Sequence, residues 1–220
     1  MKLGLGDVIQ SHIREAMRSL YTSLPAKVTK VGKSGTGVVV DVQPLINKIE
    51  ADGAAYESDI LPDVPVIMPA GGGALISLPV AVGDTVMLMF SMRSIDEFLA
   101  SDGTTLQTPF SKRTHHLSDA VAITGLFTEV NSPDIDPNNL QLRNGIGETE
   151  SLIDIDTGGN ITINAATAVN IGDEAAESLV LGDAFKAYFD GHTHPTGVGP
   201  SGPPVAPMPP TALSTYSKTN

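Results

Sequence analysis

A repeat in the second half of the chain limits what this sequence can fold into. Residues 151–171 read SLIDIDTGGNITINAATAVNI, and their apolar residues stand in pairs two positions apart, with successive pairs eight positions apart: Ile153/Ile155, Ile161/Ile163 and Val169/Ile171. Side chains alternate across a strand, so each pair predicts a short strand with one dry face and one wet face. Gly158-Gly159 and the segment 165–167 separate the strands.

The repeat is too short to form a β-helix from one chain. A single-chain coil needs roughly twenty residues per turn, and repeat structures need about three units to bury a core. Several identical chains winding together could supply that core, with one strand per chain in each layer. The sequence therefore predicts a triple-stranded β-helix over residues 140–189, intertwined in a homotrimer, which we call the shaft.

The composition favours a mainly β protein. Gly (22 residues) and Pro (16) are frequent, and aromatic residues make up 5% of the 220. Because Cys is absent, disulfides, thiolate metal sites and a Cys nucleophile are excluded. Asp7, Arg14 and Glu15 interrupt the N-terminal segment, and no run approaches eighteen apolar residues. We therefore expect neither a signal peptide nor a membrane span.

The charge is unevenly distributed. Residues 1–33 hold six Lys or Arg against two Asp or Glu, a balance of +4, so the other residues carry −16 of the net charge of −12. Nucleic-acid binding depends on clustered Lys and Arg, which the acidic body lacks. We expect no nucleic-acid partner.

Residues 1–24 predict an amphipathic helix that ends before Pro25, with Asp7 as its N-cap. Its apolar stripe recurs at three- and four-residue intervals and needs a surface to dock on, either its own domain or symmetry-related copies: Leu5, Ile9, Ile13, Met17 and Leu20.

Residues 25–110 change to an alternating pattern with Gly, Pro and Asp between the runs. Five apolar runs of strand length predict a small barrel of the oligonucleotide/oligosaccharide-binding (OB) type: AKVTKV, GVVVDVQP, DVPVIMP, ALISLPV and DTVMLMF. The adjoining loop is acidic, and the basic and aromatic residues of a nucleic-acid surface are missing. We interpret the barrel as a structural collar.

Residues 111–139 are irregular and are expected to form a linker into the shaft. His115, His116, Asp119 and nearby serines could suggest a catalytic triad. Triad members converge in space and are recognised by geometry, so crowding along the sequence is weak evidence. A solvated turn with a structural histidine is the preferred interpretation, and no catalytic residue is assigned.

Residues 190–220 form the predicted tip segment, with seven prolines between Pro195 and Pro210 that favour extended or polyproline-like chain. His192 and His194 are two positions apart, so both rings would project to one side of an extended chain. Threefold symmetry would bring six imidazoles to one axis, which suits an octahedral first-row ion such as iron better than four-coordinate zinc. The alternative is an exposed His-x-His motif beside a flexible tail.

The order of these parts resembles a known family. The barrel segment LPDVPVIMPAGGGALISLPVAVGDTVMLMFSMRSID, the segment KRTHHLSDAVAITGLF and the motif GHTHPTGVGPSGPP are similar to those of the central spike proteins of contractile-tailed bacteriophages, the baseplate assembly protein V type. The similarity covers roughly residues 20–205. The chain departs from this pattern by the 26 residues that follow His194. Either they fold back along the shaft or the histidines serve another purpose.

The resemblance implies a homotrimer at the tip of the tail tube, held by tail tube and baseplate hub proteins. It implies one iron ion per trimer, held by six histidines, of which His192 and His194 are the matching positions here. The protein would be made in the host cytoplasm and located in the virion, at the tail baseplate. It would pierce the host outer envelope when the sheath contracts.

Two alternatives stay open at this point. One is an envelope-degrading tail enzyme, although the shaft carboxylates lie on a convex wet face and not in a groove, as glycosidases require. The other is the equivalent spike of a phage-like toxin-delivery or secretion particle. We expect no enzymatic activity and no small-molecule substrate.

Overall fold

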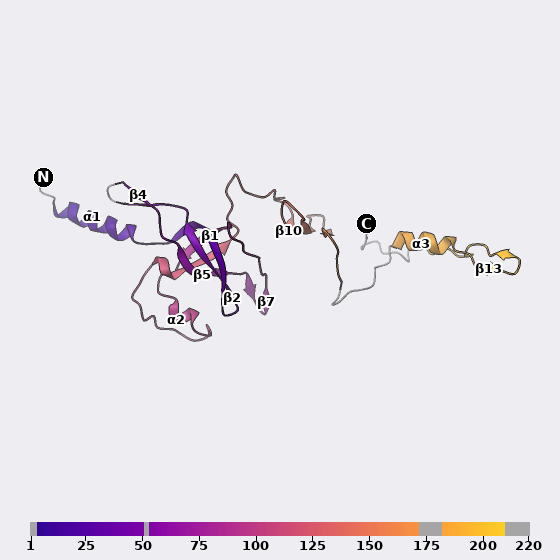
Figure 1. Cartoon of the computed structure of the whole chain (residues 1–220), viewed down its shortest axis with the longest axis horizontal. Coiled ribbons are helices and arrows are strands. Elements are labelled where there is room, and N and C mark those ends of the chain that lie inside the picture. Colours follow the sequence, from indigo (N-terminus) through magenta and orange to yellow (C-terminus); the bar gives the residue numbers. More distant parts are fainter. Residues whose placement is uncertain (1–3, 51–52, 172–181, 210–220) are drawn as a thin grey trace. The chain divides into compact units, whose positions relative to one another are not determined.

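The computed structural model describes residues 4–50, 53–171 and 182–209. The chain divides into two compact units, Met1–Asp134 and Ile135–Asn220, and each is considered by itself. Figure 1 shows the order of their elements along the chain.

The first unit is built on a closed five-stranded barrel. Its strands follow the order β1-β2-β5-β9-β8, and β9 runs parallel to β5 while the other neighbours are antiparallel. The strands are β1 (Ser23–Ser34), β2 (Gly37–Pro44), β5 (Leu61–Ile67), β8 (Thr85–Phe90) and β9 (Ala120–Thr124). A mainly β chain with an N-terminal helix and a small barrel is thereby confirmed.

Alternation along the strands places the barrel core. In β8, Val86, Leu88 and Phe90 are buried while Thr85, Met87 and Met89 face outward. The same period fills the interior from the other strands with mostly small and branched residues, as small barrels require: Ala26, Val28, Val40, Val42, Leu61, Val64, Ala120 and Ala122.

One of the five predicted barrel strands is wrong. The run ALISLPV contributes only β7 (Ala74–Leu75), which pairs with β6 (Ala70–Gly71) in a separate two-stranded hairpin. Gly72 and Gly73 have positive φ and make that tight turn possible. The fifth strand is β9 instead, from the residues assigned to the linker. Its inward residues are alanines, which gave only a weak hydrophobic signal.

The remaining elements of this unit are short. β3 (Lys48–Ile49) and β4 (Ala55–Tyr56) form a hairpin in the acidic loop, α2 spans Asp96–Leu99, and a single 3₁₀ turn spans Leu117–Asp119.

Helix α1 spans Leu5–Arg18 and has no buried residue. The predicted N-cap is wrong: Gly4 caps the helix, and Asp7 lies three positions later, where its Oδ2 accepts a hydrogen bond from the Gly4 N–H at 3.0 Å. The apolar stripe is 48–77% exposed from Leu5 to Leu20. The helix therefore does not pack this stripe on its own domain.

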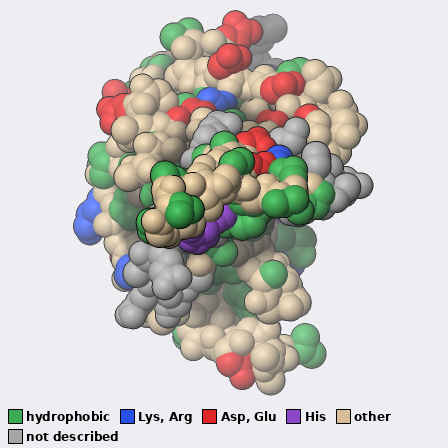
Figure 2. All heavy atoms as spheres, turned by 90° about the vertical axis from the view of Figure 1, so that its right-hand side faces the viewer, with side chains coloured by type: hydrophobic (Ala, Val, Ile, Leu, Met, Phe, Trp, Pro, Cys, Tyr) green, Lys and Arg blue, Asp and Glu red, His purple; other side chains and the backbone are tan. Residues whose placement is uncertain are grey.

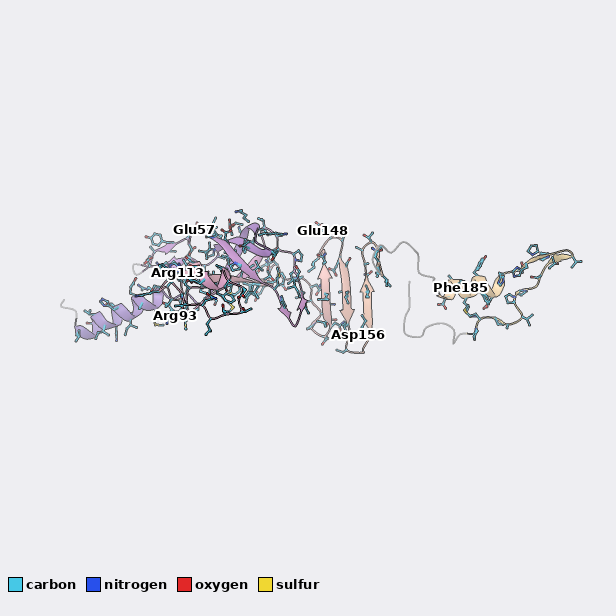
Figure 3. The ribbon with its side chains drawn as sticks, turned by 90° about the horizontal axis from the view of Figure 1, so that it is seen from below. Glu57, Arg93, Arg113, Glu148, Asp156 and Phe185 are labelled. Carbon is cyan, nitrogen blue, oxygen red and sulfur yellow. The ribbon has the colours of Figure 1, made fainter. Side chains whose placement is uncertain are left out.

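The second unit begins with an antiparallel sheet of β10 (Leu140–Asn144), β11 (Ser151–Ile155) and β12 (Ile161–Asn164). Figure 3 shows these strands side by side, with Glu148 and Asp156 in the turns at opposite ends. The first two predicted apolar pairs lie on strands, but Val169 and Ile171 do not, so that strand prediction is wrong for the single chain. A further strand considered at Leu179/Leu181 lies outside the described residues.

Helix α3 (Gly182–Gly191) precedes the proline-rich segment. That segment was predicted to be extended throughout, and it is not. β13 (Pro195–Thr196) and β14 (Gly199–Pro200) pair in a hairpin, and Gly199 has a φ of 125°, a backbone conformation that favours glycine. The chain therefore reverses direction at these residues. Among the described helices, none is both long and apolar enough to cross a membrane.

Candidate functional site

The β10–β12 sheet carries six aliphatic side chains on one face. Strand register pairs Leu142 with Ile153, and Ile153 with Ile163; the neighbouring row is Leu140, Ile155 and Ile161. These six side chains, which we call the apolar sheet face, are 37–66% exposed. Sequence reasoning missed the pair Leu140/Leu142, although it has the same two-residue spacing as the others.

The opposite face of the sheet is polar and internally bonded. Asp154 accepts hydrogen bonds from Gln141 Nε2 at 2.7 Å and Asn139 Nδ2 at 3.0 Å. Arg143 Nη2 lies 2.7 Å from Glu150 Oε2, and this guanidinium lowers the pKa of the Glu150 carboxyl. The predicted alternation of an apolar and a polar face is therefore present in the strands of one chain, but the apolar face is exposed and not dry.

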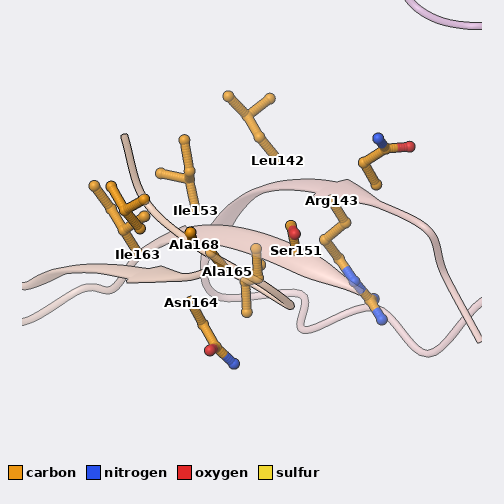
Figure 4. Close-up of a pocket in the computed structure, with 11 residues that line it drawn as sticks. Leu142, Arg143, Ser151, Ile153, Ile163, Asn164, Ala165 and Ala168 are labelled. Atoms are coloured by element: carbon orange, nitrogen blue, oxygen red, sulfur yellow. The ribbon is translucent and has the colours of Figure 1, made fainter. Parts of the chain in front are cut away.

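A groove runs along the apolar sheet face. Figure 4 shows Leu142, Ile153 and Ile163 projecting from one side of the sheet while Arg143 and Asn164 project from the other. Ala165, Ala168 and Val169 border the groove. Polar residues also line the groove, among them Arg143, Ser151 and Asn164, but its aliphatic side chains make it suited to receiving aliphatic side chains.

The structure brings the two predicted metal ligands together. The ring centroids of His192 and His194 are 5.0 Å apart. His192 Nδ1 lies 2.6 Å from the Phe189 carbonyl oxygen, which can only accept, so Nδ1 is the donor and Nε2 is the nitrogen that a metal could reach on a neutral ring. Within the described parts of the chain, no three His, Cys, Asp or Glu side chains could hold a metal ion. The donor chemistry fits a metal only if other chains add ligands.

The segment after the histidines folds back onto α3. Met208 N donates to Asp190 Oδ1 at 2.8 Å, and Lys186 Nζ donates to the Met208 carbonyl oxygen at 2.7 Å. Lys186 also bonds Asp190 Oδ2, and Lys186 is the main cause of the lowered pKa of Asp190. Up to Met208 the segment after His194 therefore returns to α3, while the fold-back along the shaft and another purpose for the histidines stay predictions.

Histidine side chains reach the surface beside hydrophobic ones on the face shown in Figure 2, where acidic side chains are also scattered. Exposed aliphatic side chains occur on each of β10, β11 and β12.

The residues considered for a triad do not form one. Asp119 is fully buried, and its carboxylate accepts hydrogen bonds from Arg113 Nε at 3.1 Å, Arg113 Nη2 at 2.9 Å and Ile95 N at 3.2 Å. The Arg113 guanidinium holds the pKa of the Asp119 carboxyl below its usual value. His116 Nδ1 accepts from the Ser118 N–H, and His115 Nδ1 lies near the Tyr21 carbonyl oxygen. Sequence reasoning missed Arg113, the partner that makes Asp119 structural.

Residues 24–125, just under half of the chain, match the family model described as the phage protein Gp138 N-terminal domain. A search of curated proteins gave no match. The matched residues contain all but the first residue of the barrel. The match indicates a phage protein with a structural role as a component of the virion.

Proposed function

We propose that three copies of this chain form the central spike of a contractile phage tail. The observation that carries the proposal is the exposed apolar sheet face, which occurs in a chain whose barrel matches a phage protein domain. A sheet with one polar, bonded face and one bare aliphatic face requires a cover. Three copies arranged around an axis would cover one another's aliphatic faces.

The free energy available from such closure is substantial. Full burial of a Leu or Ile side chain contributes about 1.5–3 kcal/mol, and these six side chains are roughly half exposed. Each would gain roughly 1 kcal/mol on burial, or about 6 kcal/mol per chain for the sheet face. Association on this scale is compatible with a stable assembly once the entropy cost of bringing chains together is deducted.

The proposed work is mechanical. Sheath contraction supplies the energy, and the spike transmits it to the host outer envelope. This work requires a stiff protein and does not require an active site. We place the protein at the tail baseplate, with tail tube and baseplate hub proteins gripping the barrel and α1. The uncovered apolar stripe of α1 supports this contact, since it packs on no surface of its own unit.

The proposed trimer also supports a metal site. His192 and His194 would hold one iron ion per trimer, with two imidazoles from each of three chains and Nε2 of His192 as one donor. The ion would cross-link the three chains; its role there is structural. Elemental analysis of tag-free protein tests the site against the double variant His192→Ala/His194→Ala. Equal metal content in the two proteins would remove it.

The decisive experiment is the mass of the protein in solution by light scattering. Ile163→Asp places a carboxylate in the dry face, and burying that charge without a partner should prevent assembly. Asn164→Asp, one residue away on the polar face, is the matched control and should remain trimeric. A monomeric wild type, or a trimeric Ile163→Asp variant, would contradict the proposal.

A further inference from the structure

The β6–β7 hairpin and the segment after it carry four exposed aliphatic side chains, although Val80 of the same segment packs against the barrel core. Leu75, Ile76, Leu78 and Val82 are 41–66% exposed, and β7 belongs to no barrel strand pair. We call residues 68–82 the arm. Its turn at Gly72-Gly73 is open, because a Cβ at either glycine would meet no atom within 4 Å.

A second uncovered apolar surface lies on the outside of the barrel. Register places Ile67 beside Ile123, and Ile123 beside Met87, across the neighbouring strands β5, β9 and β8; Met89 stands beside Val121 in the next row. We call these five side chains the wall. Ile67 and Met89 are each 47% exposed. Outward positions of a small barrel that faces water usually carry polar side chains, so this pattern calls for a partner.

The arm and the wall are both free of charge in a strongly acidic chain. Residues 64–83, 85–92 and 120–128 contain no Asp, Glu, Lys or Arg, whereas the whole chain has a net charge of −12. Copies of such a chain repel one another, so contact between copies is favoured over uncharged surfaces. By contrast, β1 exposes three basic side chains, Lys27, Lys30 and Lys33.

We propose that the arm of one copy packs on the wall of the next copy, so that three barrels close into a ring. This inference rests on the proposed trimer. A threefold ring joins two different patches, because each copy meets one neighbour with one surface and the other neighbour with another. The arm and the wall are two such patches of matching chemistry on one unit. The occupant of the wall is therefore a second copy of this chain.

Cysteine cross-linking tests the contact, since this sequence contains no Cys. The double variant Leu75→Cys/Met89→Cys, treated with bismaleimidoethane, should convert most of the protein to covalent dimers and trimers on a denaturing gel, with no larger product. The control Leu75→Cys/Lys30→Cys places the second thiol on the basic side of the barrel and should give at least tenfold less product. Each single-cysteine variant should stay monomeric on the gel.

The outcomes separate this inference from the proposed function. Light scattering on the same untreated samples reports the mass. A trimeric mass without cross-links, or with cross-links only inside one chain, would overturn the arm–wall contact and leave the trimer standing, with another tail protein as the occupant. Cross-links from a single cysteine at residue 75 would place arm against arm and also overturn it. A monomeric mass would overturn the trimer and this contact together.

Discussion

Replacing Arg113 with Met should loosen the barrel selectively. The Asp119 carboxylate accepts three hydrogen bonds, two from the charged Arg113 guanidinium and one from the neutral Ile95 N–H. The same guanidinium also donates to Ser94 Oγ at 3.0 Å and to Asp96 Oδ2 at 2.8 Å, so one side chain joins the segment that holds Ser94 and Asp96 to the turn that holds Asp119. Figure 3 labels Arg113 in this unit together with Arg93, an exposed arginine of the same barrel unit.

The size of the effect follows from the burial of Asp119. Removing one partner of a buried ion pair costs about 3–5 kcal/mol, because it leaves an uncompensated charge. The Arg113 side chain is 28% exposed, which argues for the lower end, about 3 kcal/mol. At 1.36 kcal/mol per tenfold change, the opening equilibrium of the surrounding strands should rise roughly 150-fold.

Hydrogen exchange measured by mass spectrometry can read this locally. Peptides covering β8 and β9 should exchange roughly 150-fold faster in Arg113→Met, while peptides from β10–β12 should keep the wild-type rate. Arg93→Met is the matched control and should change neither set. A change of less than about threefold in β8 and β9 would refute the view that this ion pair holds the barrel closed.

Three further outcomes are expected. The pKa of Asp119 is lower in the folded than in the unfolded protein. The contribution of its carboxylate to the free energy of unfolding is therefore present above the unfolded pKa of about 3.9 and is lost as pH falls through the folded pKa. The difference in urea midpoint between wild type and Asp119→Asn should be constant from pH 7 to about 5 and shrink below about pH 4. Gly145→Ala should destabilise the β10–β11 hairpin by at least about 1 kcal/mol in a denaturant titration, since φ is 73° and the new Cβ would lie 2.3 Å from the Thr149 carbonyl oxygen. The control Gly147→Ala, also at positive φ but in open space, should lower the free energy of unfolding by less. Deleting residues 1–19 removes α1 but keeps Tyr21, which packs against Phe90. The truncated protein should still have the mass of a trimer in solution, while its incorporation into particles should fall. Normal incorporation would argue against a docking role for α1.

The sequence predicted the elements whose signal is periodic. The stripe of α1, the alternation in β8 and the pairs Ile153/Ile155 and Ile161/Ile163 each follow from one repeating rule. Strand β9 was missed because alanine fills its inward positions, so its burial came from the close approach of neighbouring strands and not from large side chains. The run ALISLPV was misassigned because its residues favour a strand, whereas the Gly72-Gly73 turn pairs it only with its own neighbour.

The metal site itself stays a prediction, and only the closeness of its two histidines can be compared with the structure. Two-residue spacing was enough to expect His192 and His194 together, and their rings do lie close to each other. The bond from His192 Nδ1 to the Phe189 carbonyl and the return of the chain to Met208 depend on where α3 ends, which the sequence left ambiguous. Arg113 was missed because an ion pair with Asp119 needs two loops to meet, and no local spacing reports that.

The fold-back at residues 195–208 has a mechanical consequence. A free chain end can fray residue by residue, whereas the hairpin of β13 and β14 is a closed turn, and both ends of its loop are tied to α3. A force on that turn is shared by the outgoing strand β13 and the returning strand β14. Opening the whole fold-back requires breaking the two hydrogen bonds between His194 and Ser201 beside the hairpin and the bonds of Met208 to Lys186 and Asp190 at the helix, so the closed end is held at two places.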